Sequence, residues 1–298
     1  MISKMDDELS YLIFDPSYQI LFFLLKYMGL KITNLPISNY MTAYPISVEP
    51  KVPLMEAINF MAERGFGNLV VSDGTTPKGI LTEREILKVI ASSKDLHNLK
   101  VQDVGWQPYV KLPLGYTVLD AAHQMIRKKS RLLVFDDDKL VGIVTVSDLL
   151  RAFRKTRNDS PLDSVISIKL EKCKSSDSVF DAVKKLHEKR IGSIIVDDMK
   201  GYGIFTERDL LTHITSGNFN IHDQVAKHSS SPMIVANVGI SVHDAASIMA
   251  SKNIKRLGLV KDGVLVGMVT ARDIVDAYQS EHPVTNPYLE DLSEYISG

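Results

Sequence analysis

Gly79-Ile-Leu-Thr-Glu-Arg-Glu-Ile-Leu87 is one of four similar stretches that determine the fold. The other three are Gly142-Ile-Val-Thr-Val-Ser-Asp-Leu-Leu150, Gly203-Ile-Phe-Thr-Glu-Arg-Asp-Leu-Leu211 and Gly267-Met-Val-Thr-Ala-Arg-Asp-Ile-Val275. Their first glycines are 63, 61 and 64 residues apart along the chain. A second element precedes each stretch, and its alanine (57, 121, 182 or 245) lies 21 or 22 residues before the glycine. Because two elements keep the same spacing four times, the sequence predicts four tandem structural repeats.

Each repeat has the same local pattern. Apolar residues at helical spacing, as in Leu54, Ala57, Ile58 and Met61, predict an amphipathic first helix. Two short apolar runs follow, and turn residues such as Asp262-Gly263 separate them as in a hairpin. Second helices are expected over Glu83–Ile90, Val146–Phe153, Glu207–Ile214 and Ala271–Tyr278. With a short extended piece before the first helix (45–48 or 233–236), each repeat is predicted to be a β-α-β-β-α unit of the α/β (α+β) class.

The repeats are expected to pair. A unit of about 60 residues buries only ~60% of its unfolded surface alone, so neighbours should complete each other's core. The polar run 155–161, closed by a proline, is the best break between two pairs. The expected boundaries are an N-terminal helical extension (1–34), repeats 1 to 4 (35–94, 95–157, 158–217 and 218–280) and a C-terminal tail (281–298).

Composition excludes several classes of protein. The 298 residues carry 35 Lys plus Arg and 36 Asp plus Glu, so no basic excess is present for nucleic acid or an anionic membrane. A single cysteine excludes an internal disulfide, which favours the cytoplasm. The N-terminus has no secretory signal pattern, and the most apolar stretch (20–30) is far shorter than the ~20 residues that span a bilayer. We therefore expect no membrane span.

The repeated Thr-x-x-Asp/Glu has two interpretations. Threonine at a helix N-cap with an acid three residues later is a capping box. The box favours Glu or Gln, and the shorter Asp is expected to reach the cap poorly, which would free its carboxylate for a ligand such as a vicinal diol. The pairs are Thr82/Glu85, Thr145/Asp148, Thr206/Asp209 and Thr270/Asp273.

Basic residues surround this motif. A helix N-terminus presents free N–H groups and positive potential, which suit a phosphate. Arg84, Arg208 and Arg272 each follow the repeated threonine by two residues, where a solvated helix face is the alternative. Arg131 and Lys255-Arg256 open the first hairpin strand of the even repeats. Arginine at the edge of an apolar strand needs a partner, and an anion or a structural carboxylate would serve.

The spacing of Gly-h-x-Thr-x-x-Asp (h is apolar) after a strand pair resembles the cystathionine-beta-synthase (CBS) domain family, over about residues 35–279. In that family two domains pack head to tail as a Bateman module, with nucleotide clefts between them. Four copies with little else resemble the gamma subunit of AMP-activated protein kinase. The resemblance therefore implies two Bateman modules and adenosine-containing ligands.

The resemblance also implies a set of ligand-binding residues. Ribose hydroxyls would bind Asp209, Asp273 and Asp148, and Glu85 less well. Phosphate or ribose would contact Thr206, Thr270, Thr145 and Thr82, and phosphates would be neutralised by Arg208, Arg272, Arg84, Arg256, Lys255 and Arg131. The adenine edge would face the backbone of Pro45-Ile46, Tyr109-Val110 and Met233-Ile234, flanked by Phe66, Ile191 and Ile254. Because repeats 1 to 3 depart from the family pattern, one or two occupied sites are expected, using Asp209 and Asp273.

No catalytic constellation is visible. The eight histidines are scattered and most of them are expected on surfaces or helix flanks, and Cys173 is expected to be a buried structural thiol. Neither a Gly-x-x-x-x-Gly-Lys-Ser/Thr loop nor a Gly-x-Gly-x-x-Gly fingerprint occurs. We therefore expect that the protein is not an enzyme and that it uses neither a catalytic cofactor nor a metal ion.

The predicted function is regulatory. The chain would bind AMP, ADP or ATP between paired repeats and signal occupancy to an unidentified protein partner or a second copy. A ligand-free scaffold is the first alternative. A sensor of S-adenosylmethionine is the second, although a sulfonium cation would favour fewer arginines.

Overall fold

Four β-α-β-β-α repeats make up the computed structural model, which describes residues 35–128, 131–156, 158–162, 170–197 and 201–280. The expected N-terminal helix and C-terminal tail lie outside these residues. Repeat 1 contains β2 (Ser47–Val48), α3 (Leu54–Arg64), β3 (Asn68–Asp73), β4 (Thr76–Thr82) and α4 (Glu83–Ala91). Repeat 2 contains β5 (Tyr109–Pro113), α6 (Val118–Lys128), β6 (Arg131–Asp136), β7 (Lys139–Val144) and α7 (Val146–Phe153).

The second half repeats the same order. Repeat 3 contains β8 (Lys172–Lys174), α8 (Val179–Lys189), β9 (Ser193–Asp197), β10 (Gly203–Thr206) and α9 (Glu207–Ile214). Repeat 4 contains β11 (Val235–Asn237), α10 (Val242–Lys252), β12 (Arg256–Lys261), β13 (Val264–Thr270) and α11 (Ala271–Ser280). The connecting segments form η2 (Ile37–Asn39), β1 (Thr42–Ala43), η3 (Leu96–Asn98), α5 (Val101–Val104) and η5 (Val225–His228).

Every repeat has the same sheet topology. Its first strand is parallel to the second, and the second is antiparallel to the third. β1, near the start of repeat 1, pairs with β7 of repeat 2 and so links the two repeats. The predicted β-α-β-β-α fold is confirmed, and the four second helices begin at the residues that the sequence predicted.

Sheets meet within each half of the chain. Val70 and Ile80 of repeat 1 pack against Leu133, Phe135 and other apolar residues of repeat 2. In the second half, Ile195 and Ile204 of repeat 3 pack against Met233, beside the strands of repeat 4. Repeats 1 and 2 therefore form one module, and repeats 3 and 4 form another.

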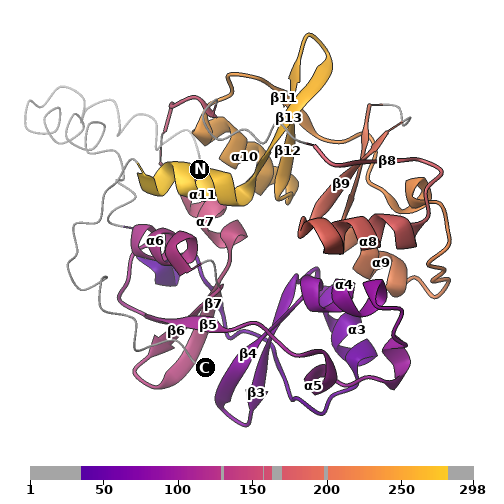
Figure 1. Cartoon of the computed structure of the whole chain (residues 1–298). Coiled ribbons are helices and arrows are strands. Elements are labelled where there is room, and N and C mark those ends of the chain that lie inside the picture. The colour runs from indigo at the N-terminus through magenta and orange to yellow at the C-terminus, as the bar shows by residue number, and fades with distance from the viewer. Residues whose placement is uncertain (1–34, 129–130, 157, 163–169, 198–200, 281–298) are drawn as a thin grey trace, which may run out of the picture.

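Helices join the two modules. α3 and α4 pack with α8 and α9, so repeats 1 and 3 share one hydrophobic core. α6 and α7 pack with α10 and α11, so repeats 2 and 4 share another. Figure 1 shows the resulting arrangement of four repeats around a common centre.

The segment between the modules is anchored rather than loose. Thr156 and Asn158, polar residues of the expected linker, are buried. The Thr156 carbonyl oxygen lies 2.7 Å from His243 Nδ1, and the Asn158 carbonyl accepts the backbone N–H of His243 at 3.0 Å. The start of α10 thus holds the connection between repeats 2 and 3.

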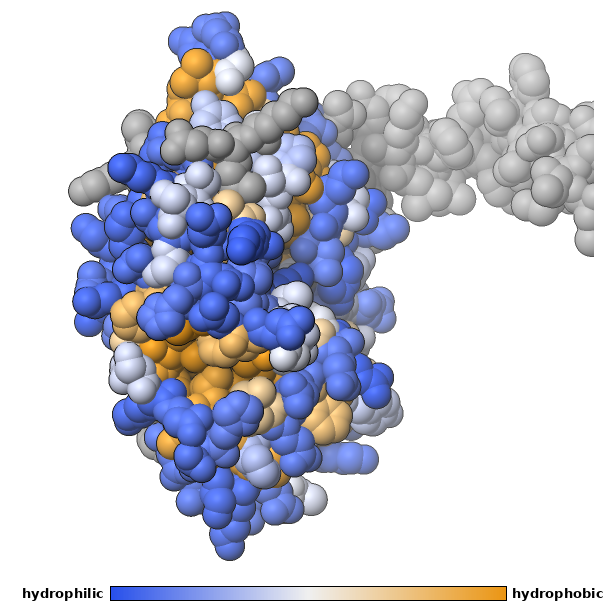
Figure 2. Space-filling model, turned by 90° about the vertical axis from the view of Figure 1, so that its right-hand side faces the viewer, coloured by the Kyte–Doolittle hydropathy of each residue, from blue (hydrophilic) through white to orange (hydrophobic). Residues whose placement is uncertain are grey.

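Figure 2 shows the side of the molecule on which repeats 1 and 3 lie. Hydrophilic residues cover most of this side, and hydrophobic residues gather mainly in one hollow in its lower half. None of the described helices has the length and run of apolar residues that crossing a bilayer requires.

Candidate functional site

A cavity of about 820 Å³ lies where the four repeats meet. The first residues of α4, α7, α9 and α11 line it, together with the residues that open β12. Four helices therefore direct their N-terminal ends toward one space. Because the first turn of a helix carries free N–H groups and partial positive charge, this space is suited to an anion.

Basic side chains dominate the cavity lining. Seven basic residues face three acidic ones there. The basic residues are Arg84, Arg131, Arg190, Arg208, Lys255, Arg256 and Arg272, and the acidic residues are Glu83, Glu207 and Asp209. Burial lowers the pKa of Arg131, Lys255 and Arg256, because it penalises their charged forms. A bound anion would offset that penalty.

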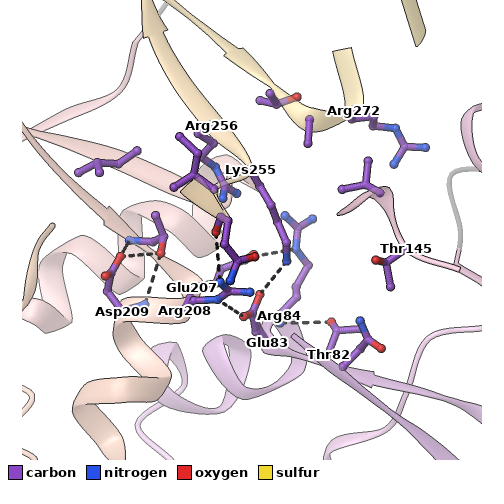
Figure 3. A pocket seen from close by; sticks show the side chains of 18 of the residues that line it. Thr82, Glu83, Arg84, Thr145, Glu207, Arg208, Asp209, Lys255, Arg256 and Arg272 are labelled. Atoms are coloured by element: carbon purple, nitrogen blue, oxygen red, sulfur yellow. Dashed lines mark hydrogen bonds and ion pairs between the residues drawn. The ribbon is translucent and has the colours of Figure 1, made fainter. Parts of the chain in front are cut away.

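Ion pairs cross the cavity in a reciprocal pattern between repeats 1 and 3 (Figure 3). Arg84 Nε lies 3.3 Å from Glu207 Oε1, and Arg208 Nε lies 3.9 Å from Glu83 Oε1. Lys255 Nζ lies 4.0 Å from the other oxygen of Glu83. Glu83 Oε1 has no hydrogen-bond partner among the described residues, so the two pairs of Glu83 are loose, whereas Arg84 donates a long hydrogen bond to Glu207. The cations are thus only partly neutralised by protein groups.

All four acids of the repeated motif turn back onto their own helix caps. Each threonine donates its hydroxyl to the acid three residues later, at 2.5 to 2.7 Å. Each also donates its backbone N–H to the same carboxylate oxygen. The expectation that Asp reaches the cap poorly is wrong, because its side chain makes both bonds. Only one carboxylate oxygen takes part, however, so the other remains for a different partner.

The second carboxylate oxygen has a different environment in each repeat. Glu85 Oε1 accepts from Gln107 at 2.7 Å, and Asp148 Oδ1 pairs with Arg151 at 2.5 Å. Both acids are 1% exposed and neither lines the cavity. Protein groups therefore occupy the oxygen that a ribose would need in repeats 1 and 2.

Asp209 is the one acid of the repeated motif that lines the cavity. Its Oδ1 accepts a hydrogen bond from the Ser230 hydroxyl at 3.2 Å, and both residues line the space. Burial raises the pKa of Asp209, although hydrogen bonds from Thr206 and Ser230 and the charge of Arg208 oppose that shift. A further hydrogen-bond donor, such as a sugar hydroxyl, would favour its charged form.

Part of the cavity lining is apolar. Ile204, Met233, Ile234 and Ile254 line it together with Pro232. They come from the repeat 3 sheet and from the segments that precede β11 and β12. The lining thus combines apolar residues, three carboxylates and a larger set of cations.

The structure gathers most of the predicted ligand residues in this cavity. They are Asp209, Thr206, Thr270, Thr145, Thr82, Arg208, Arg272, Arg84, Arg256, Lys255, Arg131, Met233, Ile234 and Ile254. Seven others do not line it: Asp273, Asp148, Glu85, Ile46, Val110, Phe66 and Ile191. Val110, Ile46 and Ile191 pack in or against the hydrophobic cores, and Phe66 is 37% exposed.

Sequence reasoning missed several cavity residues. Glu83 and Glu207 precede the motif arginines, and the recurrence of Thr-Glu-Arg in repeats 1 and 3 was a signal for them. Ser230 corresponds to Gln107 of the first module, because each forms a bridge to the third strand and bonds the motif acid, but the two residues differ in type, so only the folded arrangement reveals the match.

Comparison with known proteins agrees with this architecture. The sequence matches the CBS-domain family at residues 37–92, 101–155, 163–216 and 225–280. The uncharacterized protein MJ1404 of Methanocaldococcus jannaschii is 26% identical over 296 residues, covering 88% of this chain and 69% of the relative. MJ0653 of the same organism is 38% identical over 141 residues, covering 47% of this chain and 69% of that protein.

Solved structures share the fold. Protein MJ1225 of M. jannaschii, described as a proposed archaeal homolog of γ-AMPK, has a TM-score of 0.71 at 17% identity. The match covers 82% of this chain and 100% of that one. An uncharacterized conserved protein of Pyrococcus horikoshii has a TM-score of 0.55 at 22% identity, covering 81% and 98%.

Proposed function

This chain belongs to the CBS-domain family, and we propose that it is a regulatory protein that binds an adenine nucleotide in the central cavity. CBS domains act as regulatory modules and often bind adenosine-containing ligands. The observation that carries the proposal is the convergence of four helix N-termini and seven basic residues on one space. A cavity of about 820 Å³ is within the range of small-molecule sites.

Phosphates would occupy the cationic region. Arg84, Arg208 and Lys255 already point at carboxylates there, at 3.3 to 4.0 Å. A phosphate offers more charge and more acceptor oxygens than one glutamate, so it would replace these pairs by shorter charge-assisted hydrogen bonds. The affinity for AMP, ADP or ATP would then depend on how many phosphates reach the cations.

The nucleoside would lie against the apolar part of the cavity lining. Adenine would lie among Ile204, Met233, Ile234 and Ile254, and the ribose would lie beside Asp209. Asp209 Oδ2 is committed to the cap of α9, so a ribose hydroxyl would donate to Oδ1 and displace or share the Ser230 hydroxyl. One nucleotide would thus span from repeat 4 to repeat 1.

Such a ligand would connect the two modules. Arg84 belongs to the first module, and Asp209 and Lys255 belong to the second. A bound ligand would therefore favour the arrangement of the modules that it binds more tightly. The size of that preference is the difference between its binding free energies for the two arrangements. A protein partner or a second copy that contacts both modules would sense that change.

Calorimetric titration of AMP, ADP and ATP against wild-type protein and Asp209→Ala tests the proposal. We expect saturable nucleotide binding to the wild type. In the variant the affinity should fall about ten- to a hundredfold, because one hydrogen bond to a charged group is lost. Asp181→Ala is the matched control. Asp181 makes the same cap bonds at the start of α8, to Ser178, but lies outside the cavity lining.

Both variants should lose about 1 kcal/mol of stability through the weakened cap. Equal nucleotide affinity in Asp209→Ala and wild type would show that the site is misplaced. If no nucleotide binds and S-adenosylmethionine does, the ligand class is wrong. If nothing binds, the scaffold alternative stands.

A further inference from the structure

Two imidazoles and a carboxylate meet at the end of α9 that is remote from the cavity. His213 lies in the last turn of α9, Asp223 lies in the loop that follows, and His228 ends η5. One ligand atom of each residue lies within 4.8 Å of the other two. Among the described residues this is the one group of His, Cys, Asp and Glu with such geometry. Most histidines were expected on surfaces or helix flanks, and His213, in the last turn of its helix, is only 3% exposed.

His213 has the hydrogen-bonding pattern of a metal ligand. Its Nε2 lies 3.1 Å from the carbonyl oxygen of Asn220, to which an Nε2–H can donate. Its Nδ1 is buried and has no partner among the residues that the structure describes. With the proton on Nε2, Nδ1 carries a free lone pair. Metal-bound histidines commonly donate their other N–H to a backbone carbonyl in this way.

Asn220 also orients the carboxylate. Its side-chain Nδ2 donates to Asp223 Oδ1 at 3.1 Å, and its carbonyl accepts the Asp223 backbone N–H at 3.0 Å. Asp223 Oδ2 then lies 3.2 Å from His228 Nε2. One asparagine thus holds two of the three groups, which leaves few conformations for the site to lose when it binds an ion.

We propose that His213, Asp223 and His228 bind a divalent transition metal ion of the zinc type. Two imidazoles and a carboxylate match the ligands of zinc, with a water in the fourth position. The His228 and Asp223 side chains are 20% and 28% exposed, so that position is open to solvent. Zinc bonds of about 2.0–2.2 Å place tetrahedral ligand atoms roughly 3.4 Å apart, so the ligand atoms would move by about 1 Å or less. The stacked rings of His213 and His228 would also tilt apart, so that both nitrogen lone pairs point at the ion.

The ion would clamp η5 against α9. The rings of His213 and His228 already stack, with centroids 3.4 Å apart. His228 lies two residues before Ser230, and the Ser230 hydroxyl donates a hydrogen bond to Asp209 in the cavity. Metal binding would therefore restrict the segment that carries Ser230. This consequence alone rests on the proposed function, whereas the metal site itself does not.

The test uses tag-free full-length protein without nucleotide. Zinc titrated by calorimetry, with metal content measured after dialysis, should show one ion per chain. His228→Gln and Asp223→Asn should each weaken zinc binding at least about tenfold. His222→Gln is the matched control, since His222 is an exposed histidine in the same loop and lies outside the cluster.

Cobalt provides a second measurement that needs no variant. Bound to wild type, Co²⁺ should show the intense visible absorption of four-coordinate nitrogen and oxygen ligation, and zinc should abolish it. Absence of that absorption, absence of saturable zinc binding, or wild-type zinc affinity in folded His228→Gln would each overturn the proposal. The cluster would then be a stacked imidazole pair that only packs η5. Because no nucleotide is present, failure of nucleotide binding leaves these outcomes unchanged.

Discussion

Asp209 has two roles because a carboxylate has two oxygens. Its Oδ2 accepts from the Thr206 hydroxyl and backbone N–H, which completes the capping box of α9. Its Oδ1 faces Ser230 and the cavity. The cap and ligand interpretations of the repeated motif are therefore compatible. Asp148 and Glu85 differ from Asp209 because Arg151 and Gln107 take the remaining oxygen and neither acid lines the cavity.

Glu207→Gln should strengthen the binding of nucleotides with more phosphates. Glu207 pairs with Arg84 and lies near Arg256, so it competes with phosphate for both cations. A partly exposed ion pair contributes about 1 kcal/mol. Removing the charge of Glu207 should therefore raise the affinity for ATP about fivefold and the affinity for AMP by less. Calorimetry measures both, with Glu188→Gln on the exposed face of α8 as control. Weaker ATP binding would mean that Glu207 positions the arginines instead of competing.

Cys173 should be unreactive in the folded protein. It is 5% exposed on β8, and burial raises its pKa to about 11. At pH 8 it is almost entirely a thiol, and the thiolate is the nucleophile. Maleimide labelling at pH 8 should therefore be slow in buffer and fast in denaturant. Fast labelling of native protein would contradict the buried position.

The same shift has a consequence for stability. An unfolded cysteine loses its proton near pH 9, whereas the native one keeps it to about 11. The unfolded state thus binds fewer protons between these values, so the free energy of unfolding should fall as the pH rises. Cys173→Ala should reduce that slope in urea titrations at pH 8 and 10.

At the scale of elements, the turn between α8 and β9 positions a cation. A Cβ on Gly192 would overlap the guanidinium of Arg256 and lie 3.0 Å from Glu207 Oε2. Gly192→Ala should therefore displace Arg256 and weaken nucleotide binding severalfold. Because a flexible side chain can move aside, the loss of stability should be small. Gly115→Ala, where a Cβ would meet nothing within 4 Å, is the control. Unchanged affinity would show that Arg256 does not bind the ligand.

The elements themselves could be predicted because their signals are local. Helical spacing of apolar residues, turn residues and the repeated threonine lie within a few residues of each boundary, and α7 and α9 have the predicted bounds. The reach of Asp to its cap was misjudged, because that depends on the backbone geometry of the first turn. The histidine cluster was missed, since its members are 5 to 15 residues apart and meet through a loop.

At the scale of the whole molecule, the pairing of helices was not visible in the sequence. The first and second helices of all repeats have similar apolar faces, so nothing local specifies that repeat 1 meets repeat 3 and repeat 2 meets repeat 4. That pairing brings residues of all four repeats to the central cavity. It also makes the two modules dependent on each other, because each hydrophobic core takes residues from both.

Tyr278→Ala tests this dependence. The Tyr278 ring on α11 stacks on Phe153 of α7 with centroids 3.9 Å apart, and its hydroxyl donates to the Phe153 carbonyl at 3.2 Å. Removing so large a buried ring should cost about 3–5 kcal/mol. Tyr44→Ala, at a residue that is 82% exposed, should change stability by less than about 0.5 kcal/mol.

The chain's single tryptophan separates cooperative from independent unfolding. Trp106 packs against the core shared by repeats 1 and 3, whereas Tyr278 lies in the core shared by repeats 2 and 4. If the two cores unfold together, Tyr278→Ala should lower the urea midpoint of Trp106 fluorescence as much as that of far-UV circular dichroism. A fluorescence midpoint that stays at the wild-type value would mean that the two cores unfold separately. Binding of a ligand in the central cavity could then not be transmitted through the packed arrangement of the four repeats. A partner would have to contact the rim of the cavity itself.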